Sequence, residues 1–192
     1  MPATTSASEQ LEQQQRRQLL DAAETLFYGN GIQAVGMDQI RAHSGLPLKQ
    51  IYRLYPSKEQ LVVGMLQRRD TAWRGRMAAA VERVRDPRER VLAVFDWLYQ
   101  WFAEPGFRGC AWINAYGELG SQSPAVAEAV RAHKQAFHRY VARLMTEAGQ
   151  TGPAAEAVCL LAEGAMVTAA IERRPDPAIR ARTAVASLLT RP

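Results

Sequence analysis

Apolar side chains recur along this chain every three or four residues, which is the period of an amphipathic helix. The clearest stripe near the N-terminus consists of Leu19, Leu20, Ala22, Ala23, Leu26 and Phe27. Glycines, prolines and capping residues interrupt the pattern at intervals. The pattern predicts a first helix that ends at residues 29–31, and further helices near 37–43, 47–55, 57 to the low 80s, 88–103, 109–120, 125–148, 154–172 and 178–190.

Helix-capping signals support this division of the chain. Ser6 with Glu9, and Ser57 with Gln60, have the spacing of a capping box, in which a hydroxyl and a long side chain satisfy each other's backbone N–H groups. Ala, Leu, Arg, Glu and Gln dominate the composition, and no alternating Val/Ile/Thr run has the length of a strand. The sequence therefore predicts an all-α protein of about nine helices.

The helices group into two predicted domains. Residues 1–56 hold three helices and form an N-terminal domain, while residues 57–192 form a larger C-terminal domain. The helix that starts at residue 57 connects the two. At 192 residues the chain is long enough for two small domains.

The stretch IRAHSGLPLKQIYRLYPSK, residues 40–58, has the pattern of a helix-turn-helix. Gly45 supplies the turn, and apolar side chains lock the crossing of the two helices: Ile40, Leu46, Ile51 and Leu54. Arg41 stands where such a hairpin usually has a small residue. We expect its aliphatic stem to cover the hairpin and its head to reach Asp38, with phosphate contact as the alternative.

The second helix of the hairpin has a face that is not needed for the core, formed by Leu48, Lys49, Gln50, Tyr52 and Arg53. The first turn of such a helix enters the major groove, where Gln can address adenine and Lys or Arg can address guanine. Lys58 and the free N–H groups of the next helix suit a phosphate. For Tyr52 and Lys58 the alternatives are simple packing and a solvated charge.

Three blocks make the chain resemble the DNA-binding domain of TetR-type repressors: LLDAAETLFYGNG, HSGL and IYRLYPSKEQL, within residues 16–66. The resemblance implies a homodimer with a C-terminal ligand pocket whose occupancy alters DNA binding. It also implies that Tyr52 and Lys58 contact phosphate and that Lys49, Gln50 and Arg53 face the DNA. Gly36 occupies a capping position where the family commonly has a hydroxyl residue, and Pro47 stands where serine is common.

Aromatic residues gather in the C-terminal domain, mainly between positions 95 and 116. Trp and Tyr suit a small-molecule pocket because they offer flat area and one polar tip. The candidate effector-binding residues are Trp97, Trp101, Trp112, Tyr116, His133, Phe137 and Met166. Each could instead belong to the core, and His133 could be a buried histidine that is satisfied by a neighbour. The expected effector is a partly apolar or aromatic small molecule.

The last two predicted helices are rich in small and apolar residues. Such helices can pair with the same two helices of a second chain to make a four-helix dimer interface. We therefore expect a homodimer through helices 8 and 9, with packing inside one chain as the alternative.

The remaining observations mainly exclude function classes. The net charge is +5, and residues 59–85 contribute +3 of it, so charge alone is weak evidence for nucleic acid. Cys110 and Cys159 are far apart, and the sequence contains no cluster of metal-binding type, so we expect no metal and no cofactor. No membrane span or signal peptide is expected, which favours the cytoplasm.

The functional prediction is a ligand-responsive transcription regulator, most simply a repressor that binds a double-stranded, near-palindromic DNA operator. An enzyme is not expected, because the sequence has no nucleophile elbow, no metal-ligand spacing and no phosphate loop. A helical interaction module without ligand response remains the alternative.

Overall fold

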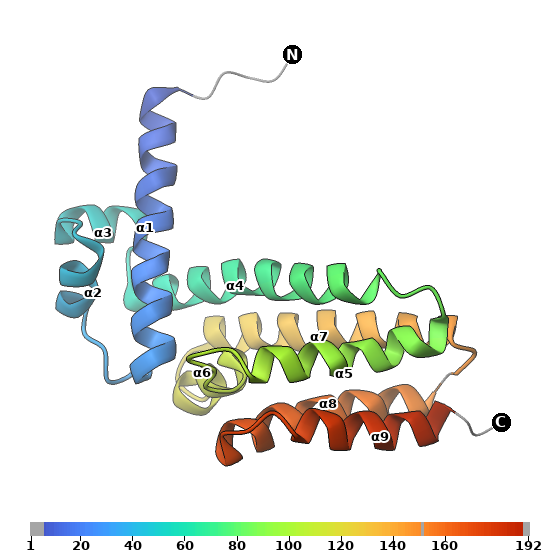
Figure 1. The fold of residues 1–192 in the computed structure, drawn as a ribbon. Helices are drawn as coiled ribbons and strands as arrows, with labels where there is room; N and C mark the ends of the chain where they lie inside the picture. Colours follow the sequence, from blue (N-terminus) through green and yellow to red (C-terminus); the bar gives the residue numbers. More distant parts are fainter. Residues whose placement is uncertain (1–5, 151, 190–192) are drawn as a thin grey trace. The chain divides into compact units, whose positions relative to one another are not determined.

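The computed structural model describes residues 6–150 and 152–189, and within them the chain forms nine α-helices and no strand. The helices are α1 (Ala7–Asn30), α2 (Met37–Ser44), α3 (Leu48–Leu54), α4 (Lys58–Val81), α5 (Pro87–Phe102), α6 (Ala111–Leu119), α7 (Pro124–Glu147), α8 (Pro153–Glu172) and α9 (Pro177–Leu189) (Figure 1). Each predicted helix is present, so the all-α prediction is confirmed. The predicted end of the last helix, residue 190, lies outside the described residues.

Capping side chains and left-handed glycines set the ends of the helices. Ser6 Oγ accepts the Glu9 N–H at 3.3 Å and Glu9 Oε2 accepts the Ser6 N–H at 2.8 Å. These two bonds form the predicted capping box. Gly31, with φ of 92°, follows the last turn of α1. At the start of α4, Ser57 Oγ accepts the Gln60 N–H at 3.1 Å. The chain therefore turns where the sequence places its caps.

The chain divides into two compact units. The first contains the described residues up to Arg68 together with Asn114–Ala129, and the second contains Arg69–Ile113 together with the described residues from Val130 onward. Helices α4, α6 and α7 each contribute residues to both units. The boundary that the sequence predicts between residues 56 and 57 stays a prediction, since compactness alone does not define an independently folding domain.

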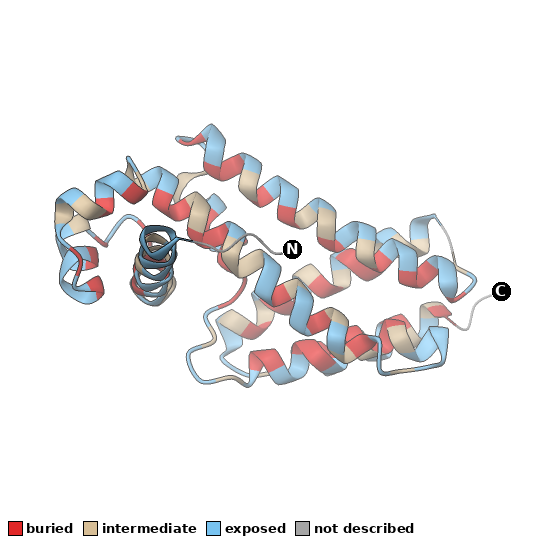
Figure 2. Cartoon of the chain, turned by 90° about the horizontal axis from the view of Figure 1, so that it is seen from above, coloured by how far each residue is buried: buried red, intermediate tan, exposed pale blue. Residues whose placement is uncertain are grey.

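In the first unit, each helix buries one face and leaves the other exposed (Figure 2). Leu19 of α1, Ile40 of α2, Ile51 of α3 and Leu61 of α4 are fully buried. Arg68 near the middle of α4 joins α4 to α1 through two carboxylates, Asp21 at 2.7 Å and Glu24 at 2.8 Å. The apolar core and these ion pairs fix the helical hairpin on α1 and α4.

The second unit is built around α5, which packs against α8 and α9. Its buried residues cover two adjacent faces of the helix: Val91, Leu92, Val94, Phe95, Trp97, Leu98, Trp101 and Phe102. A helix that is apolar on two adjacent faces is buried on both of them, and α5 follows this rule. Much of the aromatic side-chain area of the chain is consequently inside this unit.

Helix α8 is more apolar than its burial in one chain requires. An 18-residue window within it has a mean hydropathy of 1.6, and by length and composition alone it could cross a membrane, although the sequence suggested no such run. Only a third of that window is buried in the unit. Leu160 and Ile171 are 70% and 76% exposed, and Val167 lies between them with 40% exposure. This helix therefore presents an apolar stripe that a single chain leaves uncovered.

A glycine in α4 is required by the tyrosine that ends α3. A Cβ atom at Gly64 would lie 2.6 Å from Tyr55 Cε1, whereas a Cβ atom at Gly75 of the same helix would meet nothing within 4 Å. We expect Gly64→Ala to lower the free energy of unfolding by about 1–3 kcal/mol through overpacking, and Gly75→Ala to raise it by up to about 1 kcal/mol. Urea denaturation of both variants measures this difference, and equal stabilisation by the two would contradict it.

Candidate functional site

The hairpin of α2 and α3 has the geometry that the sequence predicts for a helix-turn-helix. Gly45 connects the helices with φ of 67°. Glycine adopts this left-handed conformation without steric cost. The Gly45 N–H donates to Arg41 O at 3.0 Å, which closes the end of α2. Ile40, Ile51 and Leu54 are buried between the helices. The turn and the core together fix the direction of α3.

The side chain of Arg41 lies on the outside of this hairpin. Its Nε lies 3.5 Å from Asp38 Oδ1, three residues earlier on α2, and both side chains are largely exposed. The predicted ion pair is confirmed, and its exposure means that it adds little stability. An arginine is therefore tolerated here because its head leaves the hairpin core.

The outer face of α3 carries the candidate base-reading residues. Lys49, Tyr52 and Arg53 are exposed, while Gln50 is half-buried. The Gln50 amide donates to Gln15 Oε1 of α1 at 2.5 Å. Three of the four side chains are therefore free to meet a ligand from solvent, and the fourth is held by α1.

Gly36 and Lys58 lie at the starts of α2 and α4. Gly36 is the N-cap of α2, and its N–H donates to Gln39 Oε1 at 2.7 Å. Lys58 Nζ lies 5.8 Å from the centroid of the Phe27 ring. Partial burial lowers the pKa of Lys58, and the nearby Glu118 carboxylate opposes this shift. Lys58 is thus half-buried against α1 rather than fully extended into solvent.

The polar side of α1 holds the hairpin in place, which the sequence analysis did not predict. Gln18 Nε2 donates to Ser44 O at the hairpin turn, and Arg16 Nη1 donates to Leu54 O at the end of α3. The Arg16 guanidinium also lies over the Tyr55 ring, 5.5 Å from its centroid. This distance is typical of a cation–π contact. In the sequence these residues belong to a polar run without a motif, and their role becomes visible only when α1 is placed against the hairpin.

A second contact missed by the sequence analysis joins α6 to the loop after α1, within the first unit. Glu118 Oε2 accepts the Gln33 N–H at 2.8 Å, and Gln33 Nε2 donates to Glu118 O at 2.6 Å. Glu59 accepts a short hydrogen bond from the Ser123 hydroxyl. These bonds attach residues 114–129 to the helices of the hairpin unit.

Four tryptophans meet in the second unit and form an aromatic cluster around Trp73 of α4. The Trp73 ring contacts Trp97, Trp101 and Trp112 with centroid distances of 5.1, 5.4 and 6.1 Å, all edge to face. Phe137 lies 5.7 Å away in the same arrangement. Edge-to-face contact is a favoured geometry for aromatic pairs. Trp73 is therefore the hub of the cluster, although it was not among the predicted residues.

His133 belongs to this cluster and is a neutral, hydrogen-bonded histidine. Its ring stacks on Trp112 with centroids 3.4 Å apart and planes within 2°, and its Nδ1 lies 2.6 Å from Asp70 Oδ1. Burial lowers the pKa of His133 to about 4, which outweighs the opposing effect of Asp70. Burial raises the pKa of Asp70, but its bonds to Arg74 and His133 outweigh this effect and lower the pKa overall. An ionised Asp70 therefore accepts the Nδ1–H.

The structure brings together five of the seven predicted effector residues. Trp97, Trp101, Trp112, His133 and Phe137 share contacts around Trp73. Met166 is buried in α8 of the same unit.

Tyr116 stands apart from the cluster. It is 55% exposed and belongs to the first unit. Helical periodicity could not separate it from Trp112, because both lie one turn apart on α6.

Among residues 6–150 and 152–189, no group of three or more His, Cys, Asp or Glu side chains could hold a metal ion. Cys110 and Cys159 are both buried and unbridged.

Family comparisons agree with both halves of this description. Residues 19–65 match the family model for bacterial regulatory proteins of the tetR family, and residues 87–185 match the model for a tetracyclin repressor-like C-terminal domain. The first match contains the hairpin, and the second contains most of the aromatic cluster. The chain belongs to the TetR family of transcriptional regulators.

Solved structures of other regulators share this fold. A TetR-family regulator of Streptomyces coelicolor is 29% identical, with a TM-score of 0.83 over 92% of this chain and 95% of that one. A TetR regulator of Chloroflexus aurantiacus is 23% identical, with a TM-score of 0.83 over 95% and 97% of the two chains. NemR of E. coli in its reduced form is 22% identical, with a TM-score of 0.82 over 93% and 100%. A comparison with curated proteins finds no match.

The neutral state of His133 predicts a pH-dependent stability. Because its pKa is about 4 in the folded chain and ordinarily 6.5, the unfolded chain takes up a proton first as the pH falls. This stabilisation is complete above pH 6.5 and is lost towards pH 4. The loss amounts to about 3 kcal/mol.

Urea denaturation between these pH values measures the loss. His133→Asn, which keeps a donor for Asp70 but cannot titrate, should flatten the profile. The matched variant at the exposed His43, His43→Asn, should leave the profile unchanged. A wild-type profile that is already flat between pH 6.5 and 4 would contradict the account.

Proposed function

We propose that this protein is a ligand-responsive repressor that binds a near-palindromic DNA operator as a dimer and is released by a small molecule. The observation that carries this proposal is a rigid helix-turn-helix with a free basic and aromatic face, in a chain that also contains an enclosed aromatic cluster. Such a regulator acts in the cytoplasm, where its operator lies, and needs no catalytic residues.

The DNA-binding role is supported by the face of α3. Lys49 and Arg53 can reach guanine edges or phosphates, and the Tyr52 hydroxyl can donate to a phosphate oxygen. Gln50 is half-buried and would have to release Gln15 before it could address adenine. Gly36 would flank the groove at the start of α2, whose first-turn backbone N–H groups can meet a phosphate, and Lys58 would add a positive charge at the start of α4. Because α1 holds α3 in place, the hairpin does not need to reorder when it binds DNA.

Dimerisation is supported by the uncovered stripe on α8. Leu160, Val167 and Ile171 are exposed at helical spacing, and Gly164 lies between them. A glycine inside a helix costs roughly 1 kcal/mol relative to alanine, and close approach of a second helix offsets that cost. We propose that α8 crosses its partner's copy at Gly164, with α9 completing a four-helix interface. Two recognition helices about 34–36 Å apart would then meet successive major grooves.

The effector role is supported by the aromatic cluster of the second unit. We propose that Trp97, Trp101, Trp112, His133, Phe137 and Met166 line or border the effector site. A ligand that binds one arrangement of the dimer more tightly shifts the population towards it. Release from the operator follows if that arrangement has the wrong spacing between the recognition helices.

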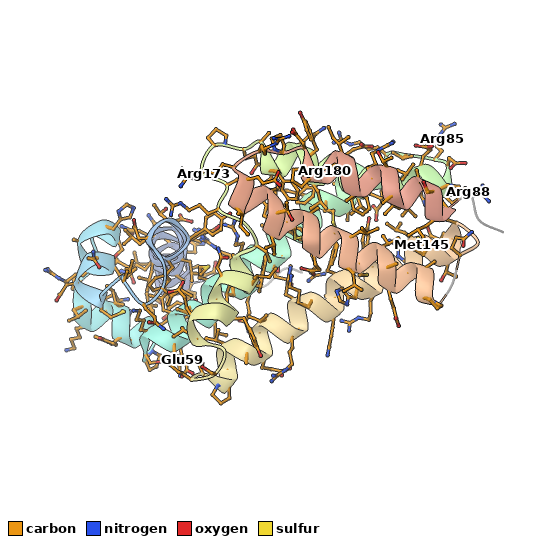
Figure 3. All side chains as sticks on the ribbon, turned by 90° about the horizontal axis from the view of Figure 1, so that it is seen from below. Glu59, Arg85, Arg88, Met145, Arg173 and Arg180 are labelled. Carbon is orange, nitrogen blue, oxygen red and sulfur yellow. The ribbon has the colours of Figure 1, made fainter. Side chains whose placement is uncertain are left out.

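DNA binding is tested with a labelled fragment of the sequence upstream of the protein's own gene, followed by fluorescence anisotropy. Arg53→Ala should weaken binding by about 1–3 kcal/mol and reduce the slope of log K against log salt concentration by about 1 if Arg53 contacts phosphate. The matched control is Arg85, which lies in the segment between α4 and α5. Its exposed side chain extends away from the helices (Figure 3). Arg85→Ala removes the same charge and should leave affinity unchanged. Equal weakening by both variants would show that only net charge matters.

The dimer interface is tested by placing a charge at Gly164. A Cβ atom there would meet nothing within 4 Å in the single chain, so Gly164→Arg should fold normally. Light scattering should give one chain mass, 21.3 kDa, for this variant and twice that mass for the wild type. The control is Gly75→Arg, at an equally open position on α4, which should remain dimeric. A dimeric Gly164→Arg variant would place the interface elsewhere.

A further inference from the structure

The hub of the aromatic cluster has a hydrogen-bond donor without an acceptor. Trp73 is 4% exposed, and its Nε1 finds no acceptor among the described residues. A buried tryptophan N–H normally has a partner, because leaving it unsatisfied forfeits the hydrogen bond it makes with water in the unfolded chain. The centre of the cluster therefore lacks one hydrogen-bond acceptor, the one that the Trp73 N–H would need.

The surroundings of this donor suit a flat ring. Trp97 and Trp101 stack on each other with planes 20° apart, and Trp112 stacks on His133. Trp73 makes edge contacts with both stacked pairs. A planar aromatic molecule can stack on these rings or contact their edges, because it presents the same kind of apolar, flat surface as the rings themselves.

A cavity adjoins the cluster inside the second unit. Its volume is about 730 Å³, and its lining combines apolar residues, among them Phe102, Phe107 and Ala169, with the charged side chains of Glu104, Arg108 and Arg173. The Phe107 and Phe102 rings lie 5.0 and 5.6 Å from Trp101, and Trp101 in turn contacts Trp73, so two layers of rings separate the cavity from the hub. This volume falls in the usual range for small-molecule sites. A ligand thus has space beside the cluster before it reaches Trp73.

The charges around the cluster favour an uncharged ligand. Asp70 is paired with Arg74 and bonded to His133. Arg76, whose guanidinium lies 5.9 Å from the Trp97 ring centroid, is paired with Glu104. The charged residues that line the cavity, Glu104, Arg108 and Arg173, are absent from the ring cluster itself. A charged ligand that moved from the cavity to Trp73 would therefore lose hydration without gaining a free counter-charge, which is costly among apolar rings.

We propose that the effector is an uncharged planar aromatic compound with a hydrogen-bond acceptor, such as a carbonyl oxygen or ring nitrogen, which receives the N–H of Trp73. This inference rests on the proposed function, because it names the chemical class of that function's effector. The bound state gains an acceptor that the free state lacks, and this difference gives the ligand a preference for one conformation of the protein.

Three bicyclic probes of nearly the same shape test the proposal on the full chain by calorimetric titration near neutral pH. Quinoline carries an acceptor nitrogen, naphthalene carries none, and N-methylquinolinium is a cation without an acceptor. Quinoline should bind about tenfold more tightly than naphthalene, the difference expected for one buried hydrogen bond. N-methylquinolinium should bind more weakly than both.

Two conservative variants assign the preference to one atom. Trp73→Phe removes the N–H while keeping an aromatic ring, and it should bind quinoline and naphthalene equally. Trp97→Phe removes the same amount of ring from the same cluster and should keep the preference for quinoline. Thermal unfolding verifies that both variants are folded.

Results that would overturn the proposed effector class can be told apart from results that would contradict the repressor function. Equal binding of quinoline and naphthalene by the wild type would show that neighbouring ring faces already satisfy the Trp73 N–H. Tightest binding of N-methylquinolinium would indicate a cation site formed by tryptophan faces. Either result overturns the effector class and leaves operator binding, measured separately, intact. Loss of specific operator binding with the quinoline preference preserved would instead contradict the repressor.

Discussion

The left-handed backbone at Gly45 is the constraint on which the DNA-reading part of this molecule depends. It ends α2 and aims α3, and the Gly45 N–H bonded to Arg41 O leaves little freedom in the turn. α1 then holds both sides of the turn, through Gln18 on Ser44 O and Arg16 on Leu54 O. With these contacts in place, the exposed face of α3 is presented by a scaffold rather than by a loop. That rigidity favours readout of a fixed DNA shape over folding upon binding.

The second unit is organised around a buried aromatic cluster rather than around a backbone turn. It buries its tryptophans around Trp73 and keeps the titratable His133 neutral by desolvation, while Asp70 satisfies its Nδ1–H. The resulting interior is apolar, flat-sided and nearly free of uncompensated charge. For the effector that we propose, such an environment would favour binding by shape and by single hydrogen bonds, since each buried donor or acceptor that is left unpaired is costly.

Much of the fold could be predicted from the sequence, because its helices have strong local signals. Ser6, Ser57 and the glycines at 31 and 45 mark helix ends by side-chain and backbone chemistry that acts over three or four residues. The free face of α3 followed from helical periodicity in the same way. Trp73 escaped prediction because α4 has a weak apolar pattern, and its role depends on rings that lie far along the chain.

The same limit applies to the contacts of Gln15, Gln18 and Glu118. Their partners lie across the first unit, and in the sequence they have only the appearance of surface residues. Arg41 was predictable because its partner, Asp38, is one turn away. Local pairs can thus be read from spacing, whereas contacts between distant segments require the tertiary structure.

Footprinting of the protein on the DNA upstream of its own gene, using hydroxyl radicals, tests the central claim most directly. A dimer that presents two copies of α3 should protect two patches on one face of the duplex. Their centres should lie about one helical turn, roughly 10–10.5 base pairs, or a multiple of it apart. A single protected patch, or uniform weak protection without specific sites, would contradict a dimeric repressor that reads DNA through this helical hairpin.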